Sequence, residues 1–128
     1  MKSPARIKLT EDHRAAFRAA VARWQLALNL GDWRINLSSR RATKDCLALV
    51  DKCSIPDRMA TIRLADEWDE NTPPTEDNFD WVALHEILHI LLAEIGAVKS
   101  NPAHTFDEHM AVEHRIINTM VRLLTGKA

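Results

Sequence analysis

Residues 78–96 read NFDWVALHEILHILLAEIG, and this stretch decides how the rest of the chain is interpreted. Its apolar side chains cover nearly all sides of the helix that it predicts, and Gly96 is placed to end that helix. A helix that is apolar almost all round is expected to be buried. Within it, His85, Glu86 and His89 form a His-Glu-x-x-His motif.

The spacing of this motif has a chemical reason. His85 and His89 lie one helical turn apart, so both imidazoles project from the same face and can bind one metal ion. Glu86 is turned by about 100° around the helix, which places it beside the metal as a general base for a metal-activated water. If the two imidazoles were buried without partners, their desolvation would cost about 1–3 kcal/mol for each group. The motif therefore predicts a metal site of His85 and His89 with Glu86 as the catalytic residue.

A catalytic zinc ion usually takes a third ligand from the protein. Residues 105–124 predict a final amphipathic helix, in which Glu113 stands three residues after Met110 and four before Ile117. A carboxylate in the middle of such an apolar stripe is costly unless a cation pairs with it. We therefore expect Glu113 to be the third ligand of one Zn²⁺ per chain. His109, one turn earlier, is a candidate for a substitute ligand or for stabilising the oxyanion.

Hydrophobic periodicity predicts the elements that precede the motif. It indicates one amphipathic helix followed by three short strands, over residues 10–30, 33–38, 46–53 and 58–64. The acidic stretch 66–80 is expected to be a solvated linker. Together these elements predict a single α+β domain over residues 1–128, with an N-terminal helix, a small three-stranded sheet, the motif helix and a C-terminal helix.

The net charge of −1 is a cancellation of two blocks. Residues 1–44 hold ten basic and three acidic side chains, whereas residues 45–80 hold three basic and ten acidic ones. This division disfavours a uniformly basic nucleic-acid binder, and nucleic acid is not expected as a partner. The basic residues of the first block are expected to form a solvated face. They are Arg6, Lys8, Arg14, Arg18, Arg40, Arg41 and Lys44.

Composition also limits the compartment. Two cysteines, Cys46 and Cys53, are too few for a disulfide scaffold or a four-thiolate zinc site. The N-terminal residues lack the apolar core of a signal peptide, and the apolar runs are shorter than the roughly 20 residues that span a bilayer. A cytoplasmic protein without membrane association is therefore expected.

The motif His85-Glu86-x-x-His89, followed by Glu113 on a separate helix, resembles the gluzincin branch of the zincin metallopeptidases. The short forms found in phage and bacterial genomes are the most similar in their order of elements. The resemblance implies a minimal zincin-like domain and a zinc-dependent peptidase that acts on peptide or protein substrates. Glu86 would be the general base and proton shuttle, and the substrate would lie extended along a sheet edge, for which we expect residues 58–64.

Departures from related families leave alternatives open. Leu92 and Ile95 stand where metzincins carry glycine and histidine, so that branch is excluded. The chain has no tyrosine, and no oxyanion-stabilising residue is identified beyond His109. One alternative is therefore a metal-binding regulatory or interaction module with weak or no catalysis. Another is an amidase similar to peptide deformylase, with Cys46 as a ligand. Substrate specificity, biological process and oligomeric state are not encoded in a recognisable motif.

Overall fold

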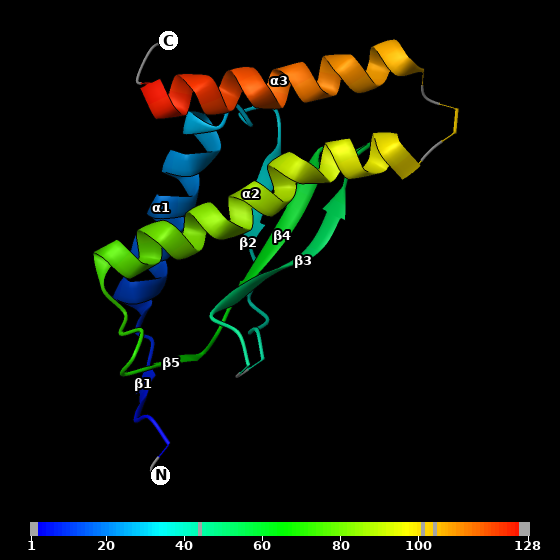
Figure 1. Cartoon of the computed structure of the whole chain (residues 1–128). Coiled ribbons are helices and arrows are strands. Elements are labelled where there is room, and N and C mark those ends of the chain that lie inside the picture. Colours follow the sequence, from blue (N-terminus) through cyan, green and yellow to red (C-terminus); the bar gives the residue numbers. More distant parts are fainter. Residues whose placement is uncertain (1–2, 44, 101, 104, 126–128) are drawn as a thin grey trace.

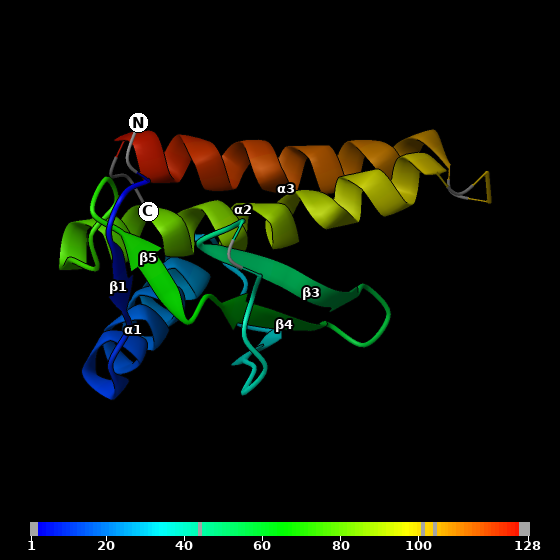
Figure 2. The ribbon, with the colours of Figure 1, turned by 90° about the horizontal axis from the view of Figure 1, so that it is seen from below.

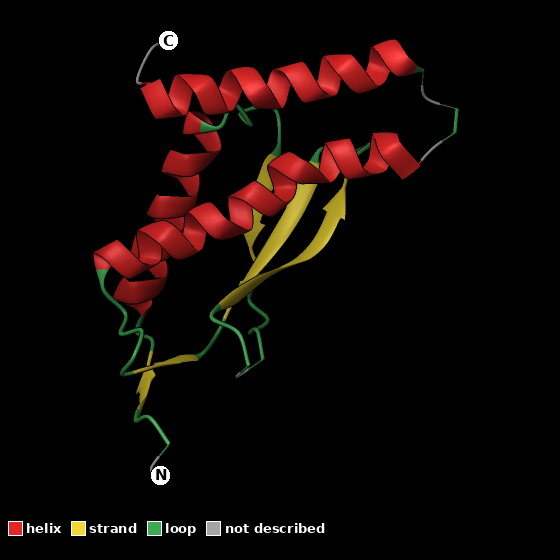
Figure 3. Ribbon diagram, in the orientation of Figure 1, coloured by secondary structure: helices red, strands yellow, loops and turns green. Residues whose placement is uncertain are grey.

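A computed structural model describes residues 3–43, 45–100, 102–103 and 105–125 of the chain. As the secondary-structure colours of Figure 3 show, two long helices cross the upper part of the molecule, a third helix descends at the left, and most of the strands lie to its right. In chain order the elements are β1 (Arg6–Lys8), α1 (Glu11–Ala27), β2 (Arg34–Leu37), β3 (Ala48–Ser54), β4 (Met59–Leu64), β5 (Glu67–Asp69), α2 (Glu76–Ser100) and α3 (Phe106–Thr125). The predicted α+β class is confirmed.

The main sheet has three strands in the order β2-β4-β3 (Figure 1). β4 pairs with β3 as an antiparallel hairpin and with β2 in parallel, so it is the central strand. The expectation that residues 58–64 form a free sheet edge is therefore wrong. The edges are β2 and β3, because β4 enters the sheet between two strands that precede it in the chain. A bulge between Val50 and Lys52 interrupts the register of β3.

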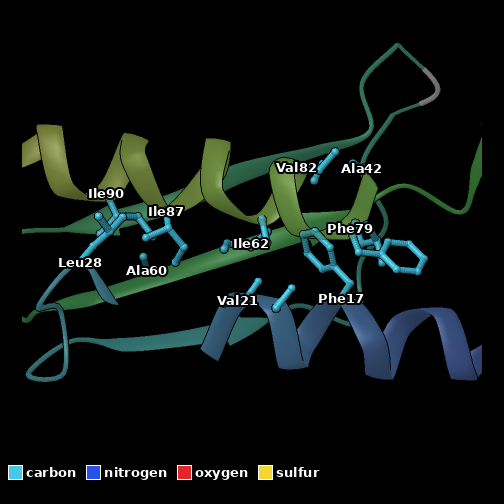
Figure 4. Close-up of a cluster of buried hydrophobic side chains, with 14 of the residues drawn as sticks. Phe17, Val21, Leu28, Ala42, Ala60, Ile62, Phe79, Val82, Ile87 and Ile90 are labelled. Atoms are coloured by element: carbon cyan, nitrogen blue, oxygen red, sulfur yellow. The ribbon is translucent and has the colours of Figure 1, made fainter. Parts of the chain in front are cut away.

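The core lies between this sheet and two helices. Ala60, Ile62 and Leu64 of β4 alternate with more exposed residues and turn one face of the sheet inward, as their spacing predicts. Phe17 of α1 and Ile87 of α2 pack against this face in one hydrophobic cluster (Figure 4). The two helices therefore share one face of the sheet, with α1 near β2 and α2 near β3.

A second, two-stranded sheet ties the N-terminal segment to the stretch before α2. β1 pairs antiparallel with β5, and these strands lie apart from the main sheet in Figure 2. Trp68 of β5 is fully buried, and its indole nitrogen donates a hydrogen bond to the carbonyl oxygen of Leu47 at 3.0 Å. The acidic stretch 66–80 is thus partly ordered, whereas the sequence predicts a solvated linker.

α2 is longer than expected at both ends. It runs through Gly96 to Ser100, so the prediction that Gly96 ends the helix is wrong. A glycine in a helix interior costs about 1 kcal/mol, and burial of Val98 beyond it favours continuation.

By length and composition alone, 23 residues of α2, Glu76–Val98, meet the criteria for a membrane-crossing helix within the described chain. The expectation that the chain does not associate with a membrane stays a prediction. α2 is also the central helix of the fold, packed against α1, β3 and α3, and core helices meet the same criteria.

Candidate metal centre

The two histidines of the motif meet on the surface of α2. His85 and His89 are both exposed, and their Nε2 atoms lie 3.3 Å apart. Their rings are nearly perpendicular, with centroids 4.9 Å apart. The expectation that the helix buries its histidines is wrong, because α2 turns its Ile87 and Ile90 side inward and leaves this face open.

This separation fits a shared metal ion. Zinc binds imidazole nitrogens at about 2.0–2.1 Å in tetrahedral geometry, so two nitrogen ligands of one ion lie about 3.3–3.4 Å apart. The Nε2 atoms of His85 and His89 already have this spacing. The imidazole pair is therefore suited to hold Zn²⁺ without a change of backbone.

Glu86 occupies a different environment from its neighbours in the motif. Only 5% of its surface is exposed, although it adjoins His85 in the chain. Burial raises the pKa of its carboxyl group, and this outweighs the opposite effects of His85 and of a hydrogen bond from the backbone N–H of Val50. A carboxylate of raised pKa in a cleft has the properties of a general base or acid.

A cleft of about 400 Å³ brings these three residues together with the edge strand β3. Its walls are formed by Ala48, Leu49, Val50, Cys53, His85, Glu86, His89 and Ala93. A second cavity of about 170 Å³ adjoins the other side of the motif, where Cys46 and Trp81 line it with His85 and Glu86. The motif therefore faces the space between α2 and β3.

Glu113 does not lie in this cleft. Its side chain is exposed on α3, so the expectation that it occupies the centre of a buried stripe is wrong. Ile117, which the same stripe includes, is 46% exposed. α3 instead turns Ile116 and Thr119 inward, because polar contacts as well as apolar ones determine its orientation.

An ion pair also joins α3 to α2. Arg115 pairs with Glu94, which also pairs with Arg58 from the β3–β4 turn. Only 5% of Glu94 is exposed, so this carboxylate is buried between its two guanidinium partners. Residues two apart project about 200° from each other on a helix, so Glu113 faces away when Arg115 faces α2.

Among the residues that the structure describes, no group of three or more His, Cys, Asp or Glu side chains is close enough to hold a metal ion. The donor set that the fold brings together is the pair His85 and His89. His109 is half-buried on α3, and neither it nor Glu113 lines the cleft. The role of Glu113 as third ligand stays a prediction.

Sequence reasoning missed the contribution of β3. This strand supplies the cleft wall, the backbone donor at Val50 and the exposed thiol of Cys53. Strand order is set by pairing in the folded sheet and has no local signal in the sequence. The three residues of the motif are recognisable because their spacing along one helix is itself the signal.

No family model matches the chain, and no curated protein or solved structure matches it. The geometry of the cleft and the sequence motif therefore carry the assignment of a function.

Proposed function

We propose that this protein is a zinc-dependent peptidase of the cytoplasm, in which His85 and His89 hold the metal ion and Glu86 is the general base. The 3.3 Å separation of the two Nε2 atoms, beside a buried carboxylate in one cleft, carries this proposal. Its substrates would be peptides or proteins, in keeping with the resemblance to short zincins.

The residues of the cleft would have separate roles in hydrolysis. Bound Zn²⁺ would supply Lewis acidity, which polarises a carbonyl group and makes water more acidic. Glu86 would take a proton from the attacking water and pass it to the departing amine. Its burial favours both steps, because a raised pKa lets the carboxyl group hold the proton between them. The Val50 N–H would keep the carboxylate oriented.

The first test separates metal binding from chemistry. Glu86→Gln should leave one zinc ion per chain and lower peptide hydrolysis by a factor of about 10²–10⁴, the usual contribution of a general base. Metal content is measured by plasma mass spectrometry, and hydrolysis by mass spectrometry of a peptide library digested from cytosolic extract. Glu76→Gln, on an exposed residue in the first turn of the same helix, is the matched control.

Two results would contradict this proposal. Unchanged hydrolysis by Glu86→Gln would remove Glu86 from the chemistry. A wild-type protein that binds zinc through His85 and His89 but cleaves no member of the library would favour the metal-binding regulatory module.

The third ligand needs its own measurement. If Glu113 is a zinc ligand, Glu113→Gln should lower the zinc affinity ten-fold or more, because one of the three bonds between the protein and the metal is lost. Competition with a chromogenic chelator gives the affinity, and Asp107→Asn on the same exposed helix is the control. Equal affinities of wild type and Glu113→Gln would exclude this residue and leave the imidazoles as the donors.

A further inference from the structure

A separate polar cavity lies near the β2 edge of the main sheet. It has a volume of about 250 Å³ and lies where β2 ends and the N-terminal half of α1 passes. Three arginines and two serines dominate its lining, which consists of Glu11, Arg14, Arg18, Leu37, Ser38, Ser39 and Arg41. The metal motif is on α2 near β3, so this cavity shares none of its residues.

Arg14 is the unusual residue of this cavity. It is only 5% exposed, and neither Nη1 nor Nη2 has a hydrogen-bond partner within the described part of the chain. A buried guanidinium normally has a carboxylate or several carbonyl acceptors, because its desolvation is otherwise uncompensated. The sequence-based expectation of a solvated basic face is therefore wrong for Arg14. Lys44 of that face lies outside the described residues.

The surroundings of Arg14 are also unfavourable to a cation. Arg18 is one helical turn away on the same face, and like charges at this spacing repel. Burial lowers the pKa of Arg14, and the charge of Arg41 lowers it further, against smaller opposite effects of Glu11 and Asp66. Asp66 contacts Arg41 at 3.6 Å instead of Arg14. Arg14 also stands in the second turn of α1, near the positive end of the helix dipole.

All these features become favourable when an anion enters the cavity. We propose that this cavity binds the phosphate group of a small molecule, with Arg14 at its floor and Arg18 and Arg41 at its rim. Guanidinium groups donate paired hydrogen bonds to phosphate oxygens, and a phosphate offers enough acceptors for more than one arginine.

Ser38 in the lining also fits this ligand, whereas Glu11 contributes the one carboxylate of the lining. The hydroxyl oxygen of Ser38 accepts a hydrogen bond from the backbone N–H of Arg40 at 3.0 Å, which leaves its own proton for a ligand. No aromatic side chain lines the cavity, so it lacks the stacking surface that single-stranded nucleic acids require. A small phosphate compound is therefore favoured over a nucleic acid strand.

Calorimetric titration of the whole protein tests this proposal without any assay of peptidase activity. The probes are inorganic phosphate, glycerol 3-phosphate, acetate and a 15-nucleotide thymidine strand. We expect saturable binding of one phosphate group per chain, abolished in Arg14→Met and weakened ten-fold or more in Arg18→Gln. Arg18 is exposed, so its replacement should preserve folding and gives a second, independent variant. Arg40→Gln removes an equal charge outside the cavity and should bind phosphate as the wild type does.

The probes also identify the source of the phosphate group. Equal or tighter binding of glycerol 3-phosphate indicates a phosphate ester as the ligand, whereas binding of inorganic phosphate alone indicates the free ion. The proposal is overturned if no saturable binding occurs or if acetate binds as tightly as phosphate. It is also overturned if Arg40→Gln loses as much affinity as Arg18→Gln. Preferential binding of the thymidine strand would instead make this face a nucleic-acid surface.

Discussion

Glu86 near one edge of the main sheet and Arg14 near the other edge are both buried ionisable side chains, and their surroundings differ. Near β3, Glu86 is buried but receives a hydrogen bond from the backbone N–H of Val50. Near β2, Arg14 is equally buried, and its terminal nitrogens have no partner within the described chain. The first site has a recognisable sequence motif, whereas the second is visible only from the packing.

A third buried charge shows how a structural role differs from both. Glu94 is as buried as the other two, but two arginines neutralise it. Its contacts join α2, α3 and the turn between β3 and β4. The comparison teaches that the partners of a buried charge, more than its burial, distinguish structural ion pairs from candidate ligand sites.

The largest effect on stability is expected where the pairing is most complete. Glu94→Gln should lower the free energy of unfolding by about 3 kcal/mol, because Arg58 and Arg115 lose their common carboxylate. Urea denaturation followed by circular dichroism measures the change. Glu76→Gln in the exposed first turn of α2 should change it by less than about 0.5 kcal/mol. A similar effect of both variants would mean that the ion pairs of Glu94 do not stabilise the fold.

Arg14 should respond in the opposite direction. In protein free of phosphate, Arg14→Met should raise the free energy of unfolding by about 2 kcal/mol, because the buried nitrogens without partners are removed and the aliphatic part is kept. The melting temperature should rise by about 7 °C for a chain of this length. If Arg14→Met destabilises the protein instead, its guanidinium makes a stabilising contact and the contrast with Glu94 fails.

The smallest change is expected at Glu86, which has an intermediate environment. Glu86→Gln should stabilise the metal-free protein by about 1 kcal/mol, because a neutral amide is less costly to bury than a carboxylate with one backbone donor. Differential scanning calorimetry in the presence of a chelator detects this shift. A loss of stability would show that the Glu86 carboxylate has more stabilising partners than the backbone N–H of Val50.

Local sequence patterns were sufficient for the elements that form the core. The alternation of Ala60, Ile62 and Leu64 predicted the inward face of β4 correctly, and apolar periodicity located the three helices. The His85, Glu86 and His89 motif also needed only local spacing. The predictions of the sheet face and of the helices succeed because each depends on neighbours within one element, whereas the metal-binding role of the motif stays a prediction.

The failed predictions depend on partners that are distant in sequence. β1 and β5 are three-residue strands that exist only through their pairing with each other. The position of β4 between β2 and β3 depends on the whole sheet. An ion pair between Arg115 and Glu94 joins α3 to α2, and the apolar stripe around Glu113 does not reveal it.

The pairing of β1 with β5 affects how the chain folds during its synthesis. Arg6 and Glu67, which contact each other in this pair of strands, are 61 positions apart. A ribosome adds about 5–20 residues per second, so Arg6 is made roughly 3–12 s before Glu67. During that interval α1 emerges before Ile62 and Ile87 have been made, and its apolar side has nothing to pack against. The nascent chain is therefore exposed to chaperones and proteases until its second half follows.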